Sequence, residues 1–444
     1  MPTRHRLLGA PLPALSAVLL AVLLAVLSAC AHPAVPAPPG AAPGGLVSTP
    51  VTVAPALAAS PFEVARRVLI PAGWSMSVWA RVEGARLAVW TPDGALLVSQ
   101  PSDGQVVRLA PGSPVGSSVL LESLDQPHGL AFDGDTLYVA QSDEIDAYHY
   151  AGGSVTDRRV VVAGLPDAKS AELGGAYAHA LKSVAVGPDH ALYFSIGSTG
   201  NISAADRDAN PQRATIMRVP PGGGAASVLA RGVRNGTGLA IAPDGSVWTA
   251  VNNRDNIAYP HGGESHGAVL DAYVADHPPE ELARLTPGRD LGWPYCNPDP
   301  DVRPGVPGTA YEYRTPRFVP DVETNPDSSK LDCAGLAPIE RTFGAHSAPL
   351  GLAFTDRLPA PYSSGALVGV HGSWNRTPPQ APELSYFPWE GGTLGPQRTL
   401  VGGFQAPDGS RWGRPVAGVV GPDGAVYLTD DQAGAVYRLS PPGR

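Results

Sequence analysis

The sequence predicts an all-β fold, a six-bladed β-propeller, from three observations. The chain of 444 residues contains 52 glycines and 49 prolines, which is typical of short strands joined by many turns. One strand–turn–strand pattern recurs along the chain, and no long segment shows the 3.6-residue period of an amphipathic helix. Hydrophobic residues make up 43% of the chain, so it can bury a core.

The N-terminus has the layout of a lipoprotein signal peptide, residues 1–29. Arg4 and Arg6 precede an apolar run that ends in LSAC, which resembles a lipobox with Cys30 as the lipidated cysteine. A retained transmembrane anchor is the alternative, although prolines interrupt the start of the run. We expect an exported protein, lipid-anchored to a bacterial membrane and facing the periplasm.

Residues 30–61 are expected to form a Pro/Ala-rich tether, since repeated Pro, Ala and Gly without charged residues cannot build a core. Removing residues 1–29 deletes two arginines and no acid, so the formal net charge changes from −9 to −11. This acidic balance argues against nucleic acid or anionic lipid as a partner. The membrane would be reached through the N-terminal lipid only.

The recurrent unit is an apolar strand, a turn rich in Asp, Gly and Pro, and a second alternating strand, which together predict a hairpin. One copy for each four-stranded blade gives six blades. The copies are Leu87–Gln100, Gly129–Gln141, Ser183–Gly197, Gly238–Val251, a degenerate Gly351–Gly372, and Gly418–Asp431.

The propeller is expected to span residues 62–444, with an insertion at about 255–340 in the long gap between the fourth and fifth copies. A ring must protect its terminal edges, so Trp74–Val82 should complete the last blade. A pair of β-sandwiches is the alternative fold, but the equal repeated units argue against it.

Once Cys30 is set aside, Cys296 and Cys333 remain as an even pair. In an oxidising compartment a disulfide is favoured over two buried thiols, and a loop of this size would contribute about 3–4 kcal/mol.

Residues just before the inner strand of each blade should converge on the central channel of a propeller. Five of the six blades carry a cationic, imidazole or amide side chain there, although each taken alone is explained equally well by a loop hydrogen bond or salt bridge. They are Gln126 and His128, His179 and Lys182, Arg234 and Asn235, His346, and Arg414.

Five blocks, HALKSVAVGPDHALYFSIGSTGN, ARGVRNGTGLAIAPDGSVWTAVNNRDN, LGWPYC, GVHGSWNR and GRPVAGVVGPDGAVYLTDD, occur in this order. Together they resemble the sorbosone and aldose sugar dehydrogenase family over about residues 62–440. The resemblance implies a six-bladed propeller that uses pyrroloquinoline quinone (PQQ) to oxidise a sugar.

The resemblance also implies residue roles. His179 would be the general base. Arg234 and Asn235 would bind the quinone oxygens, and Arg234 would also take part in catalysis by stabilising charge on the quinone. Arg414 would bind cofactor carboxylates, with Gln126 near the family's glutamine position. Lys182 and His371 complete the expected cofactor-binding set; His371 stands where soluble glucose dehydrogenases place a lysine, and Arg414 replaces their paired arginines.

Calcium is the second cofactor that the resemblance implies. It would lie near Asn253, Arg254 and Asp255, bound through backbone or side-chain oxygens, although an ordinary Asx turn explains these residues as well.

The expected function is PQQ-dependent oxidation of an aldose or related sugar aldehyde, with electrons passed to an unknown acceptor. Two alternatives stay open: a metal-dependent sugar-lactone hydrolase, which needs a carboxylate-rich central site, and a non-catalytic binding propeller.

Overall fold

The computed structural model describes residues 45–112 and 115–443, and its contacts divide the chain into two units, residues 1–39 and 40–444. The predicted signal peptide, Cys30 and the first part of the predicted tether lie outside the described residues. Within the described part of the chain, every helix is too short or too polar to cross a bilayer.

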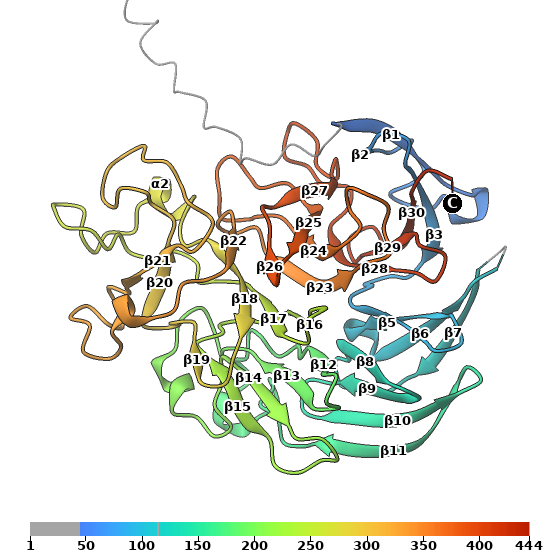
Figure 1. Ribbon diagram of the computed structural model, residues 1–444, viewed down its shortest axis with the longest axis horizontal. Helices are drawn as coiled ribbons and strands as arrows, with labels where there is room; N and C mark the ends of the chain where they lie inside the picture. The colour runs from blue at the N-terminus through green and yellow to red at the C-terminus, as the bar shows by residue number, and fades with distance from the viewer. Residues whose placement is uncertain (1–44, 113–114, 444) are drawn as a thin grey trace, which may run out of the picture. The chain divides into compact units, whose positions relative to one another are not determined.

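The second unit is a six-bladed β-propeller, as predicted (Figure 1). Each of the first three blades is a meander of four antiparallel strands. Blade one comprises β4 (Ala88–Trp90), β5 (Leu96–Gln100), β6 (Gln105–Ala110) and β7 (Gly116–Leu121), with the 3-10 helix η2 (Pro101–Asp103). Blade two comprises β8 (Gly129–Asp133), β9 (Thr136–Ala140), β10 (Ile145–Ala151) and β11 (Ser154–Val162). Blade three comprises β12 (Val184–Val186), β13 (Leu192–Ile196), β14 (Thr215–Val219) and β15 (Ser227–Arg231), with η3 (Ala171–Leu173) and η4 (Ala204–Arg207).

The last three blades follow the same order and carry longer connections. Blade four comprises β16 (Gly238–Ile241), β17 (Val247–Val251), β18 (Glu280–Leu285) and β22 (Arg341–Phe343). Blade five comprises β23 (Pro349–Thr355), β24 (Gly365–Val370), β25 (Glu383–Glu390), β26 (Thr393–Leu394) and β27 (Arg398–Val401). Blade six comprises β28 (Pro415–Val420), β29 (Val426–Asp430), β30 (Ala435–Ser440) and β3 (Ser75–Arg81), which comes from the N-terminal part of the chain.

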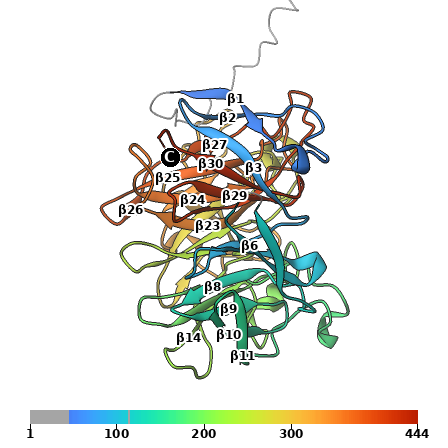
Figure 2. The same ribbon diagram turned by 90° about the vertical axis from the view of Figure 1, so that its right-hand side faces the viewer.

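The ring closes as the sequence predicted, because β3 pairs antiparallel with β30 from the other end of the chain. Val78 stands opposite Tyr437 in this register. The innermost strands contact one another in the cyclic order β4, β8, β12, β16, β23, β28 and back to β4. Figure 2 shows β3 and β30 side by side in the edge-on view. Neither terminal strand therefore leaves an open sheet edge.

The start of the propeller differs from the prediction. β1 (Leu46–Thr52) lies inside the predicted tether, pairs antiparallel with β2 (Arg67–Pro71) and continues parallel to β3. It is followed by the 3-10 helix η1 (Pro55–Leu57). The boundary at residue 62 is therefore wrong, because β-branched Val and Thr side chains in this stretch favour a strand despite its prolines.

The predicted insertion at 255–340 also needs a correction, since β18 within it is the third strand of blade four. The remaining chain forms two long loops, called excursions here: residues 252–279 between β17 and β18, and residues 286–340 between β18 and β22. The first contains α2 (Asp271–Val274). The second contains β19 (Arg289–Asp290), β20 (Cys296–Asp299), β21 (Arg317–Pro320) and η5 (Cys333–Gly335). β19 pairs parallel with β15, and β20 pairs with β21 in a separate two-stranded sheet.

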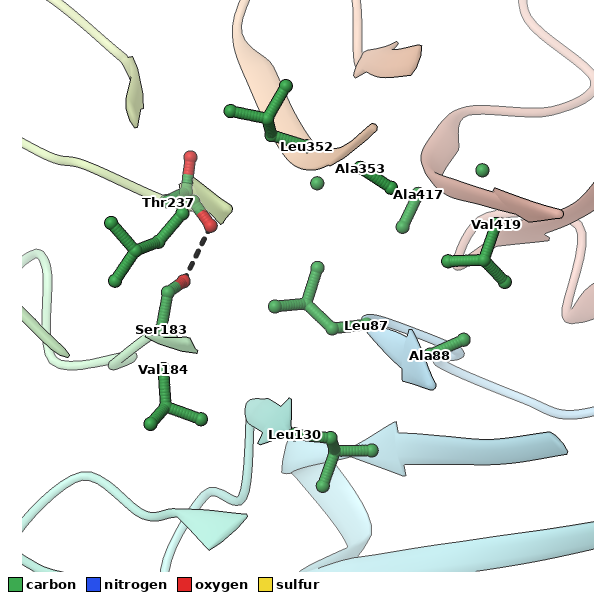
Figure 3. A pocket seen from close by; sticks show the side chains of 13 residues that line it. Leu87, Ala88, Leu130, Ser183, Val184, Thr237, Leu352, Ala353, Ala417 and Val419 are labelled. Atoms are coloured by element: carbon green, nitrogen blue, oxygen red, sulfur yellow. Dashed lines mark hydrogen bonds between the residues drawn. The ribbon is translucent and has the colours of Figure 1, made fainter. Parts of the chain in front are cut away.

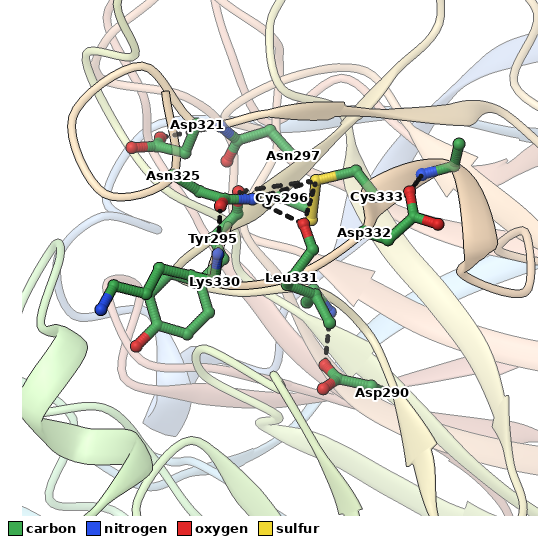
Figure 4. The surroundings of a disulfide bond; sticks show 12 residues. Asp290, Tyr295, Cys296, Asn297, Asp321, Asn325, Lys330, Leu331, Asp332 and Cys333 are labelled. Atoms are coloured by element: carbon green, nitrogen blue, oxygen red, sulfur yellow. Dashed lines mark hydrogen bonds between the residues drawn. A yellow bond between two sulfur atoms is a disulfide. The ribbon is translucent and has the colours of Figure 1, made fainter. Parts of the chain in front are cut away.

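The predicted disulfide is confirmed and joins the second excursion to itself (Figure 4). Cys296 at the start of β20 bonds Cys333 in η5, with 5.6 Å between their Cα atoms. Both cysteines are buried beside Phe318 and Ile339 in a cluster that includes side chains of blades three and four. The bond therefore fixes the excursion against the propeller.

The core consists of apolar clusters between neighbouring blades. Ala425 and Tyr427 of blade six pack with Leu96 and Val98 of blade one, for example. As a result, the second strand of most blades is buried on both faces, as in β5, β13, β17 and β29. This stacking of sheets holds the inner strands in a ring around the centre.

Candidate active site

The inner strands of all six blades line a narrow channel at the centre of the ring (Figure 3). Its cavity has a volume of about 60 Å³, and none of the thirteen lining residues carries a carboxylate. This space has room for a few water molecules and is too small for a sugar. A sugar must therefore bind outside this central cavity.

The glycines that begin the repeated inner strands allow this close approach. A Cβ atom on Gly238 would lie 2.3 Å from the carbonyl oxygen of Leu350, and one on Gly351 would lie 2.4 Å from Cβ of Ala417. A Cβ on Gly129 would be equally blocked by the backbone of blade three. The repeated glycine is thus required by packing between adjacent inner strands.

One mouth of the channel collects the predicted site residues. The strands within each blade are antiparallel, so the loop before the first strand and the loop after the second lie at the same end. The residues that these loops supply are Arg86, Gln126, His128, His179, Lys182, Arg234, Asn235, His346, His371, Arg414 and Asp431.

Arg234, before blade four, is buried and held from several sides. Nε donates to the carbonyl of Asn201 (3.2 Å), Nη1 to the carbonyl of Asn252 (3.1 Å), and Nη2 to Oδ1 of Asn201 (3.0 Å). The carboxylate of Asp255 lies 3.6 Å from Nη2 and 3.1 Å from Nδ1 of His346. Burial lowers the pKa of Arg234, yet a guanidinium stays protonated at neutral pH. Arg234 is therefore a preorganised cation at the channel mouth.

His346 completes this first group, which comprises Arg234, Asp255 and His346. Burial alone would lower the pKa of His346, but the hydrogen bond to Asp255 and the charge of Glu280 outweigh burial and raise it. Nε2 donates to the carbonyl of Val274 (2.6 Å) in α2. The excursion after β17 thus supports the first group from outside.

His179 lies beside this group, and its hydrogen bonds fix its tautomer. Nδ1 is 2.9 Å from Oγ and 3.1 Å from the carbonyl oxygen of Ser198. The hydroxyl proton of Ser198 is donated to the carbonyl of Gly200 (2.8 Å), and a carbonyl can only accept. Nδ1 must therefore carry the proton, which leaves the lone pair of a neutral imidazole on Nε2.

The surroundings keep His179 neutral. Burial, reinforced by the positive charge of Arg234, lowers the pKa of His179 to about 3. The backbone N–H of Ser198 donates to the carbonyl of Arg234 (2.7 Å), and Gly197 packs against His179 and Asn235. His179, Arg234 and Asn235, predicted to act together, therefore lie together.

A second group joins blades five, six and one: Arg86, His371, Arg414 and Asp431. Nη1 of Arg86 donates to Oδ2 of Asp431 (2.8 Å), and Nε2 of His371 donates to Oδ1 (2.8 Å). Nε of Arg414 donates to the carbonyl of His371 (2.9 Å). Burial would raise the pKa of Asp431, but His371 and Arg86 outweigh burial and lower the pKa to about 2. Two arginines and one carboxylate leave this group net positive.

Lys182 does not point into the mouth. The residue is fully buried, and Nζ donates to the carbonyls of Pro166 (2.9 Å) and Ala180 (2.5 Å) while lying 4.9 Å from the ring centroid of Tyr177. Burial lowers the pKa of Lys182 to about 7. This geometry contradicts a direct contact between Lys182 and a cofactor, because the ammonium binds two carbonyls of its own loop, the connection between β11 and β12.

Gln126 and His128 flank the same region. Gln126 is exposed, with φ of 49°, on the loop before β8. His128 is buried, and Nε2 has no hydrogen-bond partner among the described residues. Burial, together with the charge of Arg86, lowers the pKa of His128 to about 3.

The side chains of the three predicted calcium-binding residues are hydrogen-bonded or ion-paired to other protein groups. Nδ2 of Asn253 donates to Glu281 (3.0 Å), Arg254 pairs with Asp321 and Glu323, and Asp255 belongs to the first group. The structure therefore contradicts a side-chain ligand from Arg254. The carbonyl oxygens of residues 253 and 254 accept no hydrogen bond within the described part of the chain.

Sequence reasoning missed Arg86, Asp431 and Ser198. Arg86 immediately precedes the first repeat copy, so the rule that found Arg414 could have found it. Asp431 and Ser198 follow the second strands of their blades, and the antiparallel pairing places those positions at the same mouth.

Comparisons with known proteins agree with this architecture. An uncharacterized protein of Borreliella burgdorferi is 23% identical over 336 residues, which is 72% of this chain and 77% of that protein. The holo form of the pyranose dehydrogenase PQQ domain from Coprinopsis cinerea is 20% identical, with a TM-score of 0.68 over 84% of this chain and 97% of that chain. The PQQ-bound aldose sugar dehydrogenase of Streptomyces coelicolor is 16% identical, with a TM-score of 0.50 over 83% and 98%.

The solved structure of Trichoderma reesei carbohydrate-active enzyme family AA12 with iodide is also similar, at 20% identity and a TM-score of 0.67 over 84% of this chain and 97% of that chain. At these identities the likeness shows a shared fold. The family model described as TrAA12-like matches residues 68–441, which include all six blades. The chain therefore belongs to the TrAA12-like family.

Proposed function

We propose that this protein oxidises an aldose or a related sugar aldehyde with PQQ and passes the electrons to a separate acceptor. The observation that carries the proposal is a neutral imidazole with a free Nε2, His179, beside the buried cation Arg234 at the channel mouth. Family membership and the solved PQQ-containing relatives of the same fold support it.

The donor set at the mouth fits this cofactor, which carries carboxylates and two quinone oxygens. The second group is net positive, and Nε of Arg86 and Nε2 of His128 are buried without a hydrogen-bond partner among the described residues. Arginine forks suit planar carboxylates. Arg86 and Arg414 would hold the carboxylates, while Arg234 and Asn235 would hold the quinone oxygens.

When bound, PQQ supplies a two-electron acceptor for the hydride that leaves the sugar carbon. His179 accepts the proton of the sugar hydroxyl at Nε2, while Ser198 keeps Nδ1 protonated and orients the ring. An anionic ligand nearby raises the pKa of His179 towards the range useful for a base. Arg234 stabilises negative charge without having to reorganise, because three hydrogen bonds already fix it.

We also propose a calcium ion as second cofactor, held by backbone carbonyl oxygens near Asn253 and Arg254. Carbonyl oxygens are suitable calcium ligands. A calcium structure of Trichoderma reesei family AA12 has the same fold, which supports this choice.

The test is reconstitution of the purified apoprotein with PQQ and calcium, followed by dye reduction with a panel of aldoses. The proposal predicts saturable quinone binding and sugar-dependent reduction. A protein that binds the quinone but oxidises none of the sugars would contradict the substrate class. A protein that does neither would favour a binding propeller. The lack of a carboxylate among the residues that line the central cavity argues against a metal-dependent lactonase site there.

Anchoring at a membrane stays a prediction from the sequence. If Cys30 carries the lipid, Cys30→Ser should move the protein from the membrane fraction to the soluble fraction after export. Unchanged fractionation of this variant would count against a lipid anchor.

A further inference from the structure

The excursions of blade four contain a compact group of two histidines and two aspartates, away from the channel-mouth groups. His261 precedes α2 and His277 follows it, while Asp299 ends β20 and Asp301 lies two residues further. Ligand atoms of His261, Asp299 and Asp301 all lie within 4.8 Å of one another. His277 adds a fourth atom to this group, the "His–Asp cluster".

The distances in the His–Asp cluster match a small coordination shell. Nε2 of His261 is 3.6 Å from Oδ2 of Asp299. Nε2 of His277 is 3.7 Å from Oδ1 of Asp299 and 3.2 Å from Oδ1 of Asp301. Ligands about 2.0–2.1 Å from a tetrahedral ion lie about 3.3–3.4 Å apart. These pairs use both oxygens of Asp299, and small movements would bring one donor atom of each residue onto one ion.

Three buried polar atoms here have no hydrogen-bond partner among the described residues: Oδ2 of Asp299, Nε2 of His261 and the hydroxyl of Tyr273. Asp299 is 1% exposed and Tyr273 is 8% exposed. The ring of Tyr273 lies edge-on to the imidazole of His261, with 6.3 Å between centroids, so Tyr273 borders the cluster. Buried polar atoms without partners are costly, and together they indicate a missing ligand.

His277 is oriented as a metal ligand would be. Its Nδ1 donates to the carbonyl of Tyr273 (2.9 Å), which leaves Nε2 facing the two carboxylates. The Tyr273 ring stacks on the imidazole, with 3.9 Å between centroids and 9° between planes. An Nδ1–H···O=C hydrogen bond that fixes the ring and directs Nε2 inward is a common outer-shell arrangement.

We propose that His261, His277, Asp299 and Asp301 bind one divalent transition-metal ion of the zinc class. Two imidazoles and two carboxylates form a donor set that suits zinc, whereas calcium and magnesium prefer oxygen ligands alone. A dication also balances the two buried carboxylates. This proposal does not depend on the proposed sugar oxidation.

The site would connect the excursion to the channel mouth. His277 and Tyr273 flank Val274, whose carbonyl accepts the hydrogen bond from His346, and His346 in turn contacts Asp255. Asp276, next to His277, pairs with Arg376 of blade five at 2.9 Å. A metal ion that fixes this segment would therefore support the first group.

The test is the metal content of the full chain, purified without chelators and dialysed against zinc. Wild-type protein should retain about one zinc ion per chain, and His261→Asn and Asp299→Asn should lower retention about tenfold or more. The matched control is His266→Asn, an exposed histidine five residues after His261 that supplies no atom to the cluster. Its zinc content should equal that of the wild type.

Cobalt titration provides a second readout that depends on ligand geometry. The wild type and His266→Asn should develop the visible absorption of tetrahedral cobalt, and His261→Asn should not. His261 is partly exposed, so its substitution tests the site even if Asp299→Asn fails to fold. Wild-type protein without zinc, or zinc and cobalt signals unchanged in His261→Asn, would overturn the proposal.

Discussion

Two histidines, His179 and His371, face the same channel mouth from different sides of the ring, and they differ in which ring nitrogen donates a hydrogen bond. Beside the first group, Nδ1 of His179 donates to Ser198 and leaves Nε2 without a hydrogen bond in the described structure. In the second group, Nε2 of His371 donates to Asp431. An Asp–Arg ion pair accompanies both histidines, so composition alone does not separate them.

The difference in protonated nitrogen suits the two histidines to two different roles. A free Nε2 next to a fixed cation can accept a proton while charge develops nearby. An imidazole that is already bound to a carboxylate instead positions that carboxylate and the arginines around it. We therefore assign proton transfer to the side of His179 and anion binding to the side of His371.

The largest expected effect separates the two histidines directly. His179→Gln should lower turnover by about 10²–10⁴-fold, because it removes the base, while quinone affinity stays within a few-fold. His371→Gln should chiefly weaken quinone binding and leave turnover at saturating cofactor close to the wild type. Absorbance titration and dye reduction of both variants check this. Equal losses of turnover in the two variants would remove the distinction.

A smaller effect is expected for Arg414→Ala. Losing a charge-assisted contact of about 1.5–3 kcal/mol should raise the quinone dissociation constant about 10–100-fold, with turnover little changed at saturation. The matched control is Arg438→Ala on the same blade, where the guanidinium pairs with Asp423 on an exposed sheet surface. Quinone titration should show wild-type affinity in the control, and an unaffected Arg414→Ala would contradict the assigned anion site.

The smallest effect concerns a property that the two histidines share. Burial lowers the pKa of His179 to about 3 and that of His371 to about 4, below the unfolded value of about 6.5. The unfolded chain thus binds more protons in this window, so stability is lost as pH falls from about 6.5 towards 4. Removing either histidine should flatten that slope by about 1 kcal/mol per pH unit. Chemical denaturation of the apoprotein at several pH values measures it, and an unchanged slope would show that the histidine takes up its proton at the same pH in the folded and unfolded chains.

The repeats made the fold predictable from the sequence. Each copy carries a turn and two strands in order, and the closing strand follows from the need to cover an edge. β18 was missed because Glu280 and Glu281 make the strand look solvent-exposed. Both carboxyls are buried, and burial raises their pKa values to about 7 and about 8. Ionisable residues in a strand usually mark a solvent-exposed face, and the strand β18 at the channel mouth does not follow this rule.

The site was less predictable, because a sequence position fixes a loop but not the direction of a side chain. The position of Lys182 before β12 suggested a channel cation, yet its ammonium turns away to two carbonyls. The strand order places Asp431 at the mouth, but its partners come from two other blades. These partners depend on packing between blades, which local sequence does not encode.

The most direct test of this account is the tautomeric state of the two histidines, measured by correlating ring protons with ring nitrogens in histidine-labelled apoprotein by NMR. His179→Gln and His371→Gln assign the two signals. We expect both rings to be neutral at pH 7, with the proton on Nδ1 of His179 and on Nε2 of His371. The same tautomer in both rings, or a proton on Nε2 of His179, would contradict it.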